Sequence, residues 1–407
     1  MSMSLTAREM GMKNRLGLFV IFIVGALPAL IVDFDGSAYA FAAPFIISNV
    51  NLPLYYLGIL ISGYAAGIAI FSLIGGLLFD KFSPKLTVTI SILIFSVFTI
   101  TTGYSTTALE VLLSRLIVGF GVGMFQSSSI GVLGDTNPEF RGTGTMLWGV
   151  LAGVGTTAAP YIFLPFLPNY HIPFLLSGIL GFIVAAIFFA VVPSVFKKEE
   201  KPKNPLKLAL NKYTIYPIVA MFFFGFTLLN ILGYYSEFLV KIVNFSGAET
   251  AVLISMLGVG GIVFGIPAGF VSDKIGRKPI LLVGILLILV SIIAITYAPK
   301  NYVAFILLTI MFGTGWAIYS ILTPTAGQDM VKDEAVGSAS GTILMSFNIG
   351  GIIGPLMLAS YITVTRFRTG MLYFMIVPAV IALIITVFMK FPKSTKQAVE
   401  EQIKEGL

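Results

Sequence analysis

Long apolar segments alternate with short polar or charged segments along nearly the whole chain. Most are about 20 residues or longer, the length at which an α-helix crosses the hydrocarbon core of a bilayer. The pattern predicts an all-α membrane protein with twelve transmembrane helices. Six predicted helices cover residues 16–47, 54–79, 86–106, 108–132, 143–166 and 173–195, and six more cover 213–240, 248–272, 280–298, 301–326, 337–363 and 371–391.

The most polar internal stretch separates these two sets of helices. It contains the run KKEEKPKNPLK, whose prolines and like charges are typical of a linker. We therefore expect a six-helix half over residues 1–195, a cytoplasmic linker over 196–212, and a second half with a short cytoplasmic tail over 213–407.

The positive charges predict how the chain is oriented in the membrane. Of the 25 Lys and Arg residues, 20 fall in segments on the side of both termini and four in loops on the opposite side. Cytoplasmic loops carry such an excess of positive charge. The distribution predicts a multi-pass protein of the cell inner membrane with both termini in the cytoplasm.

Composition excludes several classes of protein. The chain is 57% hydrophobic and 11% charged, with a mean hydropathy of +0.98, which is far from a soluble enzyme or a nucleic-acid-binding domain. We attribute the net charge of +7 to the basic loops that set membrane topology, and not to binding of nucleic acid. Cysteine is absent and His171 is the only histidine, so we expect no disulfide, cysteine nucleophile, metal cluster or cofactor.

The two halves look like copies of each other. Short motifs recur in the same order at offsets of 193 to 195 residues, which indicates a parallel repeat. The matched motifs are Gly-x-x-x-Asp-Lys from Gly76 and Gly269, Gly-x-Gly from Gly119 and Gly313, and the sets Gly142, Gly155, Pro160 and Gly337, Gly350, Pro355.

These motifs resemble those of the major facilitator superfamily. Its loop signature G-x-L-x-D-R-x-G-R-[RK] is matched most fully by the sequence GFVSDKIGRK from Gly269, and its R-x-x-x-G-x-G pattern by Arg115, Gly119 and Gly121. The first loop copy departs from the signature, with Ser83 and Pro84 in place of Gly and Arg. The resemblance covers essentially the whole chain. It implies a secondary transporter that works by alternating access, with a site near the bilayer midplane between two pseudo-symmetric halves.

The first predicted span is similar to that of one group of transporters. The stretch from Asp35 to Pro44 resembles the D-x8-P pattern of aromatic-acid and metabolite proton symporters. This resemblance implies symport of a small organic anion with protons. Three alternatives stay open: a proton-linked antiporter exporting hydrophobic or cationic compounds, a sensor with a transporter fold, and a membrane-embedded enzyme. The expected partners are a small-molecule substrate, protons and the bilayer, for a monomer that binds no nucleic acid.

Charged side chains inside the membrane are the main candidates for proton coupling, because they are costly to bury. Asp33 and Asp35 are roughly 200° apart around a helix, so both cannot face one cavity. We assign the proton-binding or substrate-facing role to Asp35 and expect Asp33 to face neighbouring helices. Hydration at the outer mouth is the alternative for both acids. Arg115 could serve as a proton-relay partner, a carboxylate clamp or a structural pin.

A further group of residues is predicted to bind substrate. They are polar or aromatic residues on spans expected to line the cavity, and helix packing or an interfacial aromatic belt is the alternative explanation for most of them. The group comprises Tyr39, Arg115, Gln126, Asn230, Tyr234, Trp316, Tyr319 and Asn348.

Charges at the ends of the predicted spans are candidate gates. The family resemblance implies that cytoplasmic loop charges pair across the halves and hold the outward-open state, with local turn formation as the alternative. These charges are Asp80, Lys81, Arg141, Asp273, Lys274 and Arg277. Glu237 and Lys241, spaced i and i+4, form an outer gate or simply an exposed helical pair.

Overall fold

Every regular element in the described part of the chain is helical. The computed structural model describes residues 15–51, 56–136, 141–166, 169–192, 205–332, 335–362 and 365–391. The first long helices are α1 (Arg15–Asn49), α2 (Tyr56–Lys81), α3 (Pro84–Tyr104), α4 (Ala108–Thr136), α5 (Arg141–Phe163) and α6 (His171–Val191). After the short α7 (Pro205–Ala209) come α8 (Ile215–Lys241), α9 (Gly247–Ile275), α10 (Arg277–Tyr297), α11 (Tyr302–Gln328) and α12 (Val336–Tyr361). The last span consists of α13 (Phe367–Met371), a π-helical turn (Leu372–Ile376) and α14 (Val377–Phe388).

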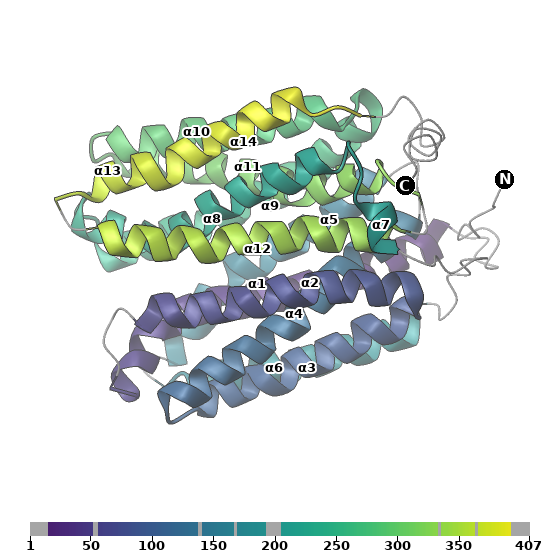
Figure 1. Cartoon of the computed structure of the whole chain (residues 1–407). Coiled ribbons are helices and arrows are strands. Elements are labelled where there is room, and N and C mark those ends of the chain that lie inside the picture. Colours follow the sequence, from purple (N-terminus) through teal and green to yellow (C-terminus); the bar gives the residue numbers. More distant parts are fainter. Residues whose placement is uncertain are drawn as a thin grey trace.

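Eleven helical segments in the described residues are long and apolar enough to cross a membrane. α5, with 23 residues, is the remaining long helix and contains many small residues. The helices lie roughly parallel in two layers, with α2, α3, α4 and α6 in one layer and α8, α10, α12 and α14 in the other (Figure 1). The prediction of an all-helical membrane protein is confirmed, and the helix bounds agree with the predicted spans to within a few residues.

Two local features were not predicted from the pattern. Part of the predicted linker forms the short helix α7. Its Ala209 belongs to a small buried cluster with Val331, which follows α11, and Val336, which begins α12. In the last span, the π-helical turn is supported by α8. Thr227 Oγ1 donates a hydrogen bond to Met375 O (3.0 Å) and Asn230 Nδ2 donates one to Phe374 O (3.0 Å). These donors bond carbonyls at a place where the regular α-helical pattern is interrupted.

The two sets of helices meet through two equivalent contacts. α2 packs on α12, and α5 packs on α9. By the sequence repeat, α9 corresponds to α2 and α12 to α5. Each contact therefore joins the second span of one set to the fifth span of the other, as a parallel repeat requires.

Repeated glycines allow matching close contacts within each set. A Cβ atom on Gly119 would fall on the carbonyl oxygen of Tyr64 in α2, and one on Gly313 would fall on the carbonyl oxygen of Leu257 in α9. These backbones approach so closely because neither glycine has a side chain. The Gly-x-Gly repeat therefore places equivalent helices in equivalent positions.

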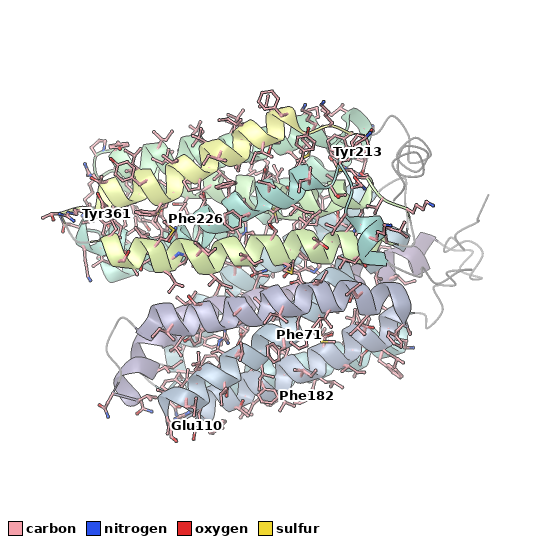
Figure 2. The ribbon with its side chains drawn as sticks, viewed as in Figure 1. Phe71, Glu110, Phe182, Tyr213, Phe226 and Tyr361 are labelled. Atoms are coloured by element: carbon pink, nitrogen blue, oxygen red, sulfur yellow. The ribbon has the colours of Figure 1, made fainter. Side chains whose placement is uncertain are left out.

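Labelled side chains show the two ends of the bundle. Glu110 and Tyr361 lie at one end and Tyr213 lies at the opposite end (Figure 2). The charge distribution predicts the first two to be outside and Tyr213 to be cytoplasmic. We call these the outer end and the cytoplasmic end below.

We expect Gly313→Val to destabilise the fold, because its side chain would overlap the α9 backbone at Leu257. Overpacking of this kind lowers the free energy of unfolding by about 1–3 kcal/mol. Thermal unfolding in detergent micelles measures the effect. Gly233→Ala is the control, since a Cβ there meets nothing within 4 Å. Equal unfolding midpoints for the two variants would contradict this explanation of the close contact.

Candidate functional site

A buried ion pair joins two helices of the first set. Arg115 Nη1 on α4 donates a hydrogen bond to Asp35 Oδ2 on α1 at 2.8 Å. The two side chains are 2% and 0% exposed, and these are the only charged residues in the described part of the chain that are fully buried. The structure thus brings together the two charges that the sequence singled out inside the membrane.

Two tyrosines enclose the guanidinium group. The Arg115 Cζ atom lies 4.2 Å from the ring centroid of Tyr39 and 4.6 Å from that of Tyr64. Cation–π attraction to both rings stabilises the charge in a site that excludes water. The ring of Tyr39 packs over Arg115 and beside Phe174, at a centroid distance of 6.5 Å from the latter, and its predicted role in substrate binding stays a prediction.

The pair does not use all of its hydrogen-bonding capacity. Arg115 Nε and the hydroxyl of Tyr39 are buried and make no hydrogen bond, and Asp35 Oδ1 makes none of ordinary geometry, although the Thr99 hydroxyl interacts with this carboxylate. Buried polar atoms in native proteins nearly always have partners. The arrangement can accept a proton on Asp35 and an additional acceptor at Arg115.

The expected orientation of the two aspartates is reversed. Asp35 faces the neighbouring helix α4, while Asp33 lines a cavity enclosed by α1, α5, α9 and α11. The reason is the packing of α1: the side that bears Asp33 lies against α5, and the opposite side meets Arg115. The angular separation of the acids is as predicted, and the assignment of faces is wrong.

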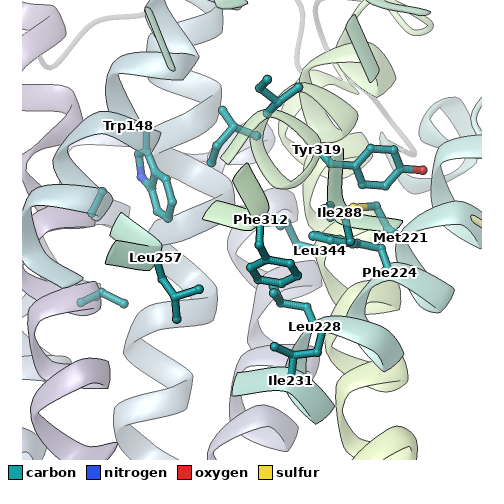
Figure 3. Packing of buried hydrophobic residues seen from close by; sticks show 14 of the residues in the cluster. Trp148, Met221, Phe224, Leu228, Ile231, Leu257, Ile288, Phe312, Tyr319 and Leu344 are labelled. Atoms are coloured by element: carbon teal, nitrogen blue, oxygen red, sulfur yellow. The ribbon is translucent and has the colours of Figure 1, made fainter. Parts of the chain in front are cut away.

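The cavity lies between the two sets of helices, midway along them. Two tryptophans line it, Trp148 from α5 and Trp316 from α11, together with glycines such as Gly153 and Gly258. Trp148 Nε1 donates a hydrogen bond to Ser129 Oγ at 3.1 Å, which orients the indole ring. In Figure 3 the Trp148 ring lies above Leu257, another lining residue.

This cavity is small in the present conformation. Its volume is about 50 Å³, enough for a few water molecules and too little for a sugar-sized solute. A solute of that size would enter only after the two sets of helices move apart.

Trp316 is the predicted substrate-binding residue that lines this cavity. Tyr319 lies instead in the hydrophobic core, where its hydroxyl is hydrogen-bonded to Thr386 Oγ1 at 2.6 Å and its ring contacts Phe224 (Figure 3). Asn348 is 3% exposed and donates to Leu344 O within its own helix. In this conformation the core occupies the ring and hydroxyl of Tyr319, so its expected substrate role stays a prediction that requires a change of packing.

The other predicted substrate residues are also away from the cavity wall. Asn230 is buried and its amide supports the last span. Tyr234 is partly buried and packs against the core. Gln126 is partly buried on α4, about 16 Å along the helix axis from Arg115.

The second set of helices carries a neutral version of the ion-pair site. By the repeat, Asn230 corresponds to Asp35 and Thr309 to Arg115. Thr309 is hydrogen-bonded to the hydroxyl of Tyr235 at 2.5 Å, in a region with no charged residue among those described as buried. Among the described residues, the fully buried charges therefore lie in the first set of helices.

A carboxylate from one set caps a helix of the other at the cytoplasmic end. Asp273 on α9 accepts hydrogen bonds from the backbone N–H groups of Gly142 and Thr143, both at 2.8 Å, and from the Thr143 hydroxyl at 2.6 Å. The carboxylate is favourably placed at the positive end of α5. Arg277 contacts Asp273 and donates to Asp329 Oδ2 at 2.8 Å. These contacts are of the kind that the predicted gate requires, and the gating role itself stays a prediction.

Of the remaining gate candidates, the structure describes the side chains of Lys274 and Lys241 and leaves four others undescribed. The Lys274 ammonium group lies 4.2 Å from the ring centroid of Phe270 on its own helix, and its expected pairing across the halves stays a prediction. Lys241 is exposed at the end of α8. The side chains of Asp80, Lys81, Arg141 and Glu237 lie outside the described residues.

Sequence reasoning missed three residues of this site. Tyr64 stacks on Arg115, Trp148 lines the cavity, and Asp329 completes the cytoplasmic cluster around Arg277. A signal for Trp148 was present, since the chain has only two tryptophans and both line the cavity. Tyr64 and Asp329 carry no such signal, because their roles depend on contacts between helices distant in sequence.

A cavity between two equivalent helix sets, near the middle of a bundle of membrane-spanning length, is the arrangement of a membrane transporter. The sequence profile described as Major Facilitator Superfamily matches residues 25–355, with a second match over 218–406. The chain belongs to this superfamily of secondary transporters.

Individual proteins are similar over most of their length. The hexuronate transporter of Bacillus subtilis (strain 168) is 26% identical over 387 residues, covering 84% of this chain and 87% of that protein. The quinolone resistance protein NorA of Staphylococcus aureus is 26% identical over 340 residues, covering 77% and 82%. The solved structure of the proton:xylose symporter XylE has a TM-score of 0.81 at 15% identity, covering 95% of this chain and 99% of that one, which shows the shared fold.

We expect Arg115→Met to destabilise the protein by about 3–5 kcal/mol, because it leaves the Asp35 carboxylate buried without its partner. The double variant Arg115→Met with Asp35→Leu removes both charges and should regain most of that loss. Thermal unfolding of the three proteins in one detergent gives the comparison. A double variant no more stable than Arg115→Met would show that the two charges do not depend on each other.

Proposed function

We propose that the protein is a proton-coupled symporter of a small organic anion, working by alternating access. The buried Asp35–Arg115 pair is the observation that carries this proposal. An arginine in this environment needs an anionic partner, since its charge is costly to leave alone inside the membrane. Either the Asp35 carboxylate or a substrate carboxylate meets that need.

This requirement links proton and substrate. A proton that binds Asp35 removes the negative charge that holds Arg115. The guanidinium group is then available to a substrate carboxylate, which suits its forked donors. Because the rings of Tyr39 and Tyr64 cover the guanidinium group, substrate reaches it only when these rings move.

The substrate class is supported by similarity as well as by the arginine. The hexuronate transporter is named for a sugar acid, a small organic anion. The span-one resemblance to metabolite proton symporters supports the same class. Bacterial relatives support placement in the cell membrane, with both termini cytoplasmic as the charge distribution predicts.

One observation favours a second candidate function. The cavity presents a single acidic residue, Asp33, together with two tryptophan rings, and these groups also suit an aromatic cation. NorA is named for quinolone resistance. A proton-linked antiporter that exports such compounds is therefore the alternative.

Transport into proteoliposomes that enclose a pH-sensitive dye tests the proposal. An outside gradient of a transported carboxylate, such as D-glucuronate, should acidify the lumen, because protons enter with the anion. Asp35→Asn should abolish proton-driven uptake and spare exchange of labelled for unlabelled substrate. Glu249→Gln is a matched control, since Glu249 is a carboxylate at the exposed outer end of α9.

Two results would contradict the proposal. Unchanged proton-driven uptake in Asp35→Asn would remove the coupling role of this residue. Lumen alkalinisation on adding a quinolone, with no response to carboxylates, would establish antiport instead.

A further inference from the structure

We propose that Asp33 is a second proton site, which binds its proton when the anion occupies the cavity and makes each transport cycle electrogenic. This inference rests on the proposed function and adds a charge count to it. It starts from the reversed orientation of the two aspartates. Asp35 is enclosed with Arg115, whereas Asp33 lines the cavity between the two sets of helices.

A substrate that passes between the helix sets meets Asp33. The cavity has walls from both sets, and Asp33 is its contribution from α1. Asp33 and Asp35 are two positions apart and point to opposite sides of α1. An anion held in this cavity therefore lies on the Asp33 side of the helix.

The described residues that line the cavity carry no positive charge to balance Asp33. The described lining from α5, α9 and α11 consists of apolar residues, glycines and neutral polar residues, of which Thr156 and Ser320 are examples. On α2, Tyr64 is the titratable group that interacts electrostatically with Asp33. On α4, Arg115 is paired with Asp35 on the far side of α1.

Like charges therefore decide the protonation state of Asp33. A carboxylate next to a bound anion in a site of low dielectric is strongly disfavoured, so the anion binds when Asp33 carries a proton. The loaded transporter then holds one proton on Asp33, a second on Asp35, and one negative charge on a monovalent substrate. The cycle moves one net positive charge inward with each anion.

Tryptophan fluorescence tests the proton site without any substrate. The only two tryptophans in the chain, Trp148 and Trp316, both line the cavity with Asp33. Their emission should therefore report a change in the charge of Asp33. Purified full-length protein in lipid nanodiscs is titrated with acid, and the emission is recorded across the pH range.

We expect one reversible transition in the wild type that is lost in Asp33→Asn and kept in Asp35→Asn. Trp148→Phe and Trp316→Phe then show which ring reports it. A transition that persists in Asp33→Asn, or its absence from the wild type, would overturn the proton site at Asp33.

Potential-driven uptake tests the charge count. Proteoliposomes with equal pH on both sides receive an inside-negative potassium diffusion potential and labelled D-glucuronate. One net charge corresponds to about 50-fold accumulation per 100 mV at equilibrium. The wild type should show a potential-driven rise toward that limit, and Asp33→Asn a ratio near one.

The outcomes separate this inference from the proposed function. Uptake by the wild type that ignores the potential, or potential-driven uptake retained in Asp33→Asn, overturns the electrogenic cycle and leaves symport intact. No uptake of carboxylates under any gradient overturns symport and the charge count together. In that case the fluorescence titration still decides whether Asp33 binds a proton.

Discussion

The pairing of Asp35 with Arg115 is the constraint on which the rest of the site depends. Two opposite charges lie deep in a bundle whose other buried residues, in the described part of the chain, are neutral. Burial of each charge alone is strongly unfavourable, so the state of one determines what the other can bind. Two tyrosine rings lie against the guanidinium group. In the proposed function, a substrate anion therefore replaces the Asp35 carboxylate at Arg115 when Asp35 binds a proton, and this exchange couples the proton to the anion.

The architecture determines how such an exchange is carried across the membrane. Close glycine contacts hold the helices of each set together, and the two sets meet through the equivalent pairs α2–α12 and α5–α9. The cavity between them has a volume of only about 50 Å³. At the cytoplasmic end, the Asp273 carboxylate from α9 caps α5 with three hydrogen bonds. The gating role predicted for these contacts requires them to break, by motion of one set against the other, when the cavity opens to the cytoplasm.

Much of this fold could be predicted from the sequence. Twenty-residue apolar segments must form helices in a bilayer, and glycine motifs at nearly constant offsets indicate a repeat. The charged residues Asp35 and Arg115 were identifiable because intramembrane charges are rare. The separate roles of Asp33 and Asp35 could not be predicted. Helical periodicity shows that the two side chains point to different sides of the helix, but it does not show which one faces α5. Tyr319 was expected in the cavity for a related reason. An aromatic residue on a cavity-lining helix can equally face the hydrophobic core.

Infrared difference spectroscopy of a pH step tests whether Asp35 binds the proton, because it observes the C=O stretching band of a protonated carboxylic acid. Acidification should produce such a band for Asp35, together with a change in the guanidinium bands of Arg115. Both signals should disappear in Asp35→Asn and persist in Glu249→Gln. Identical difference spectra for the wild type and Asp35→Asn would contradict the account, because the proton would then bind elsewhere.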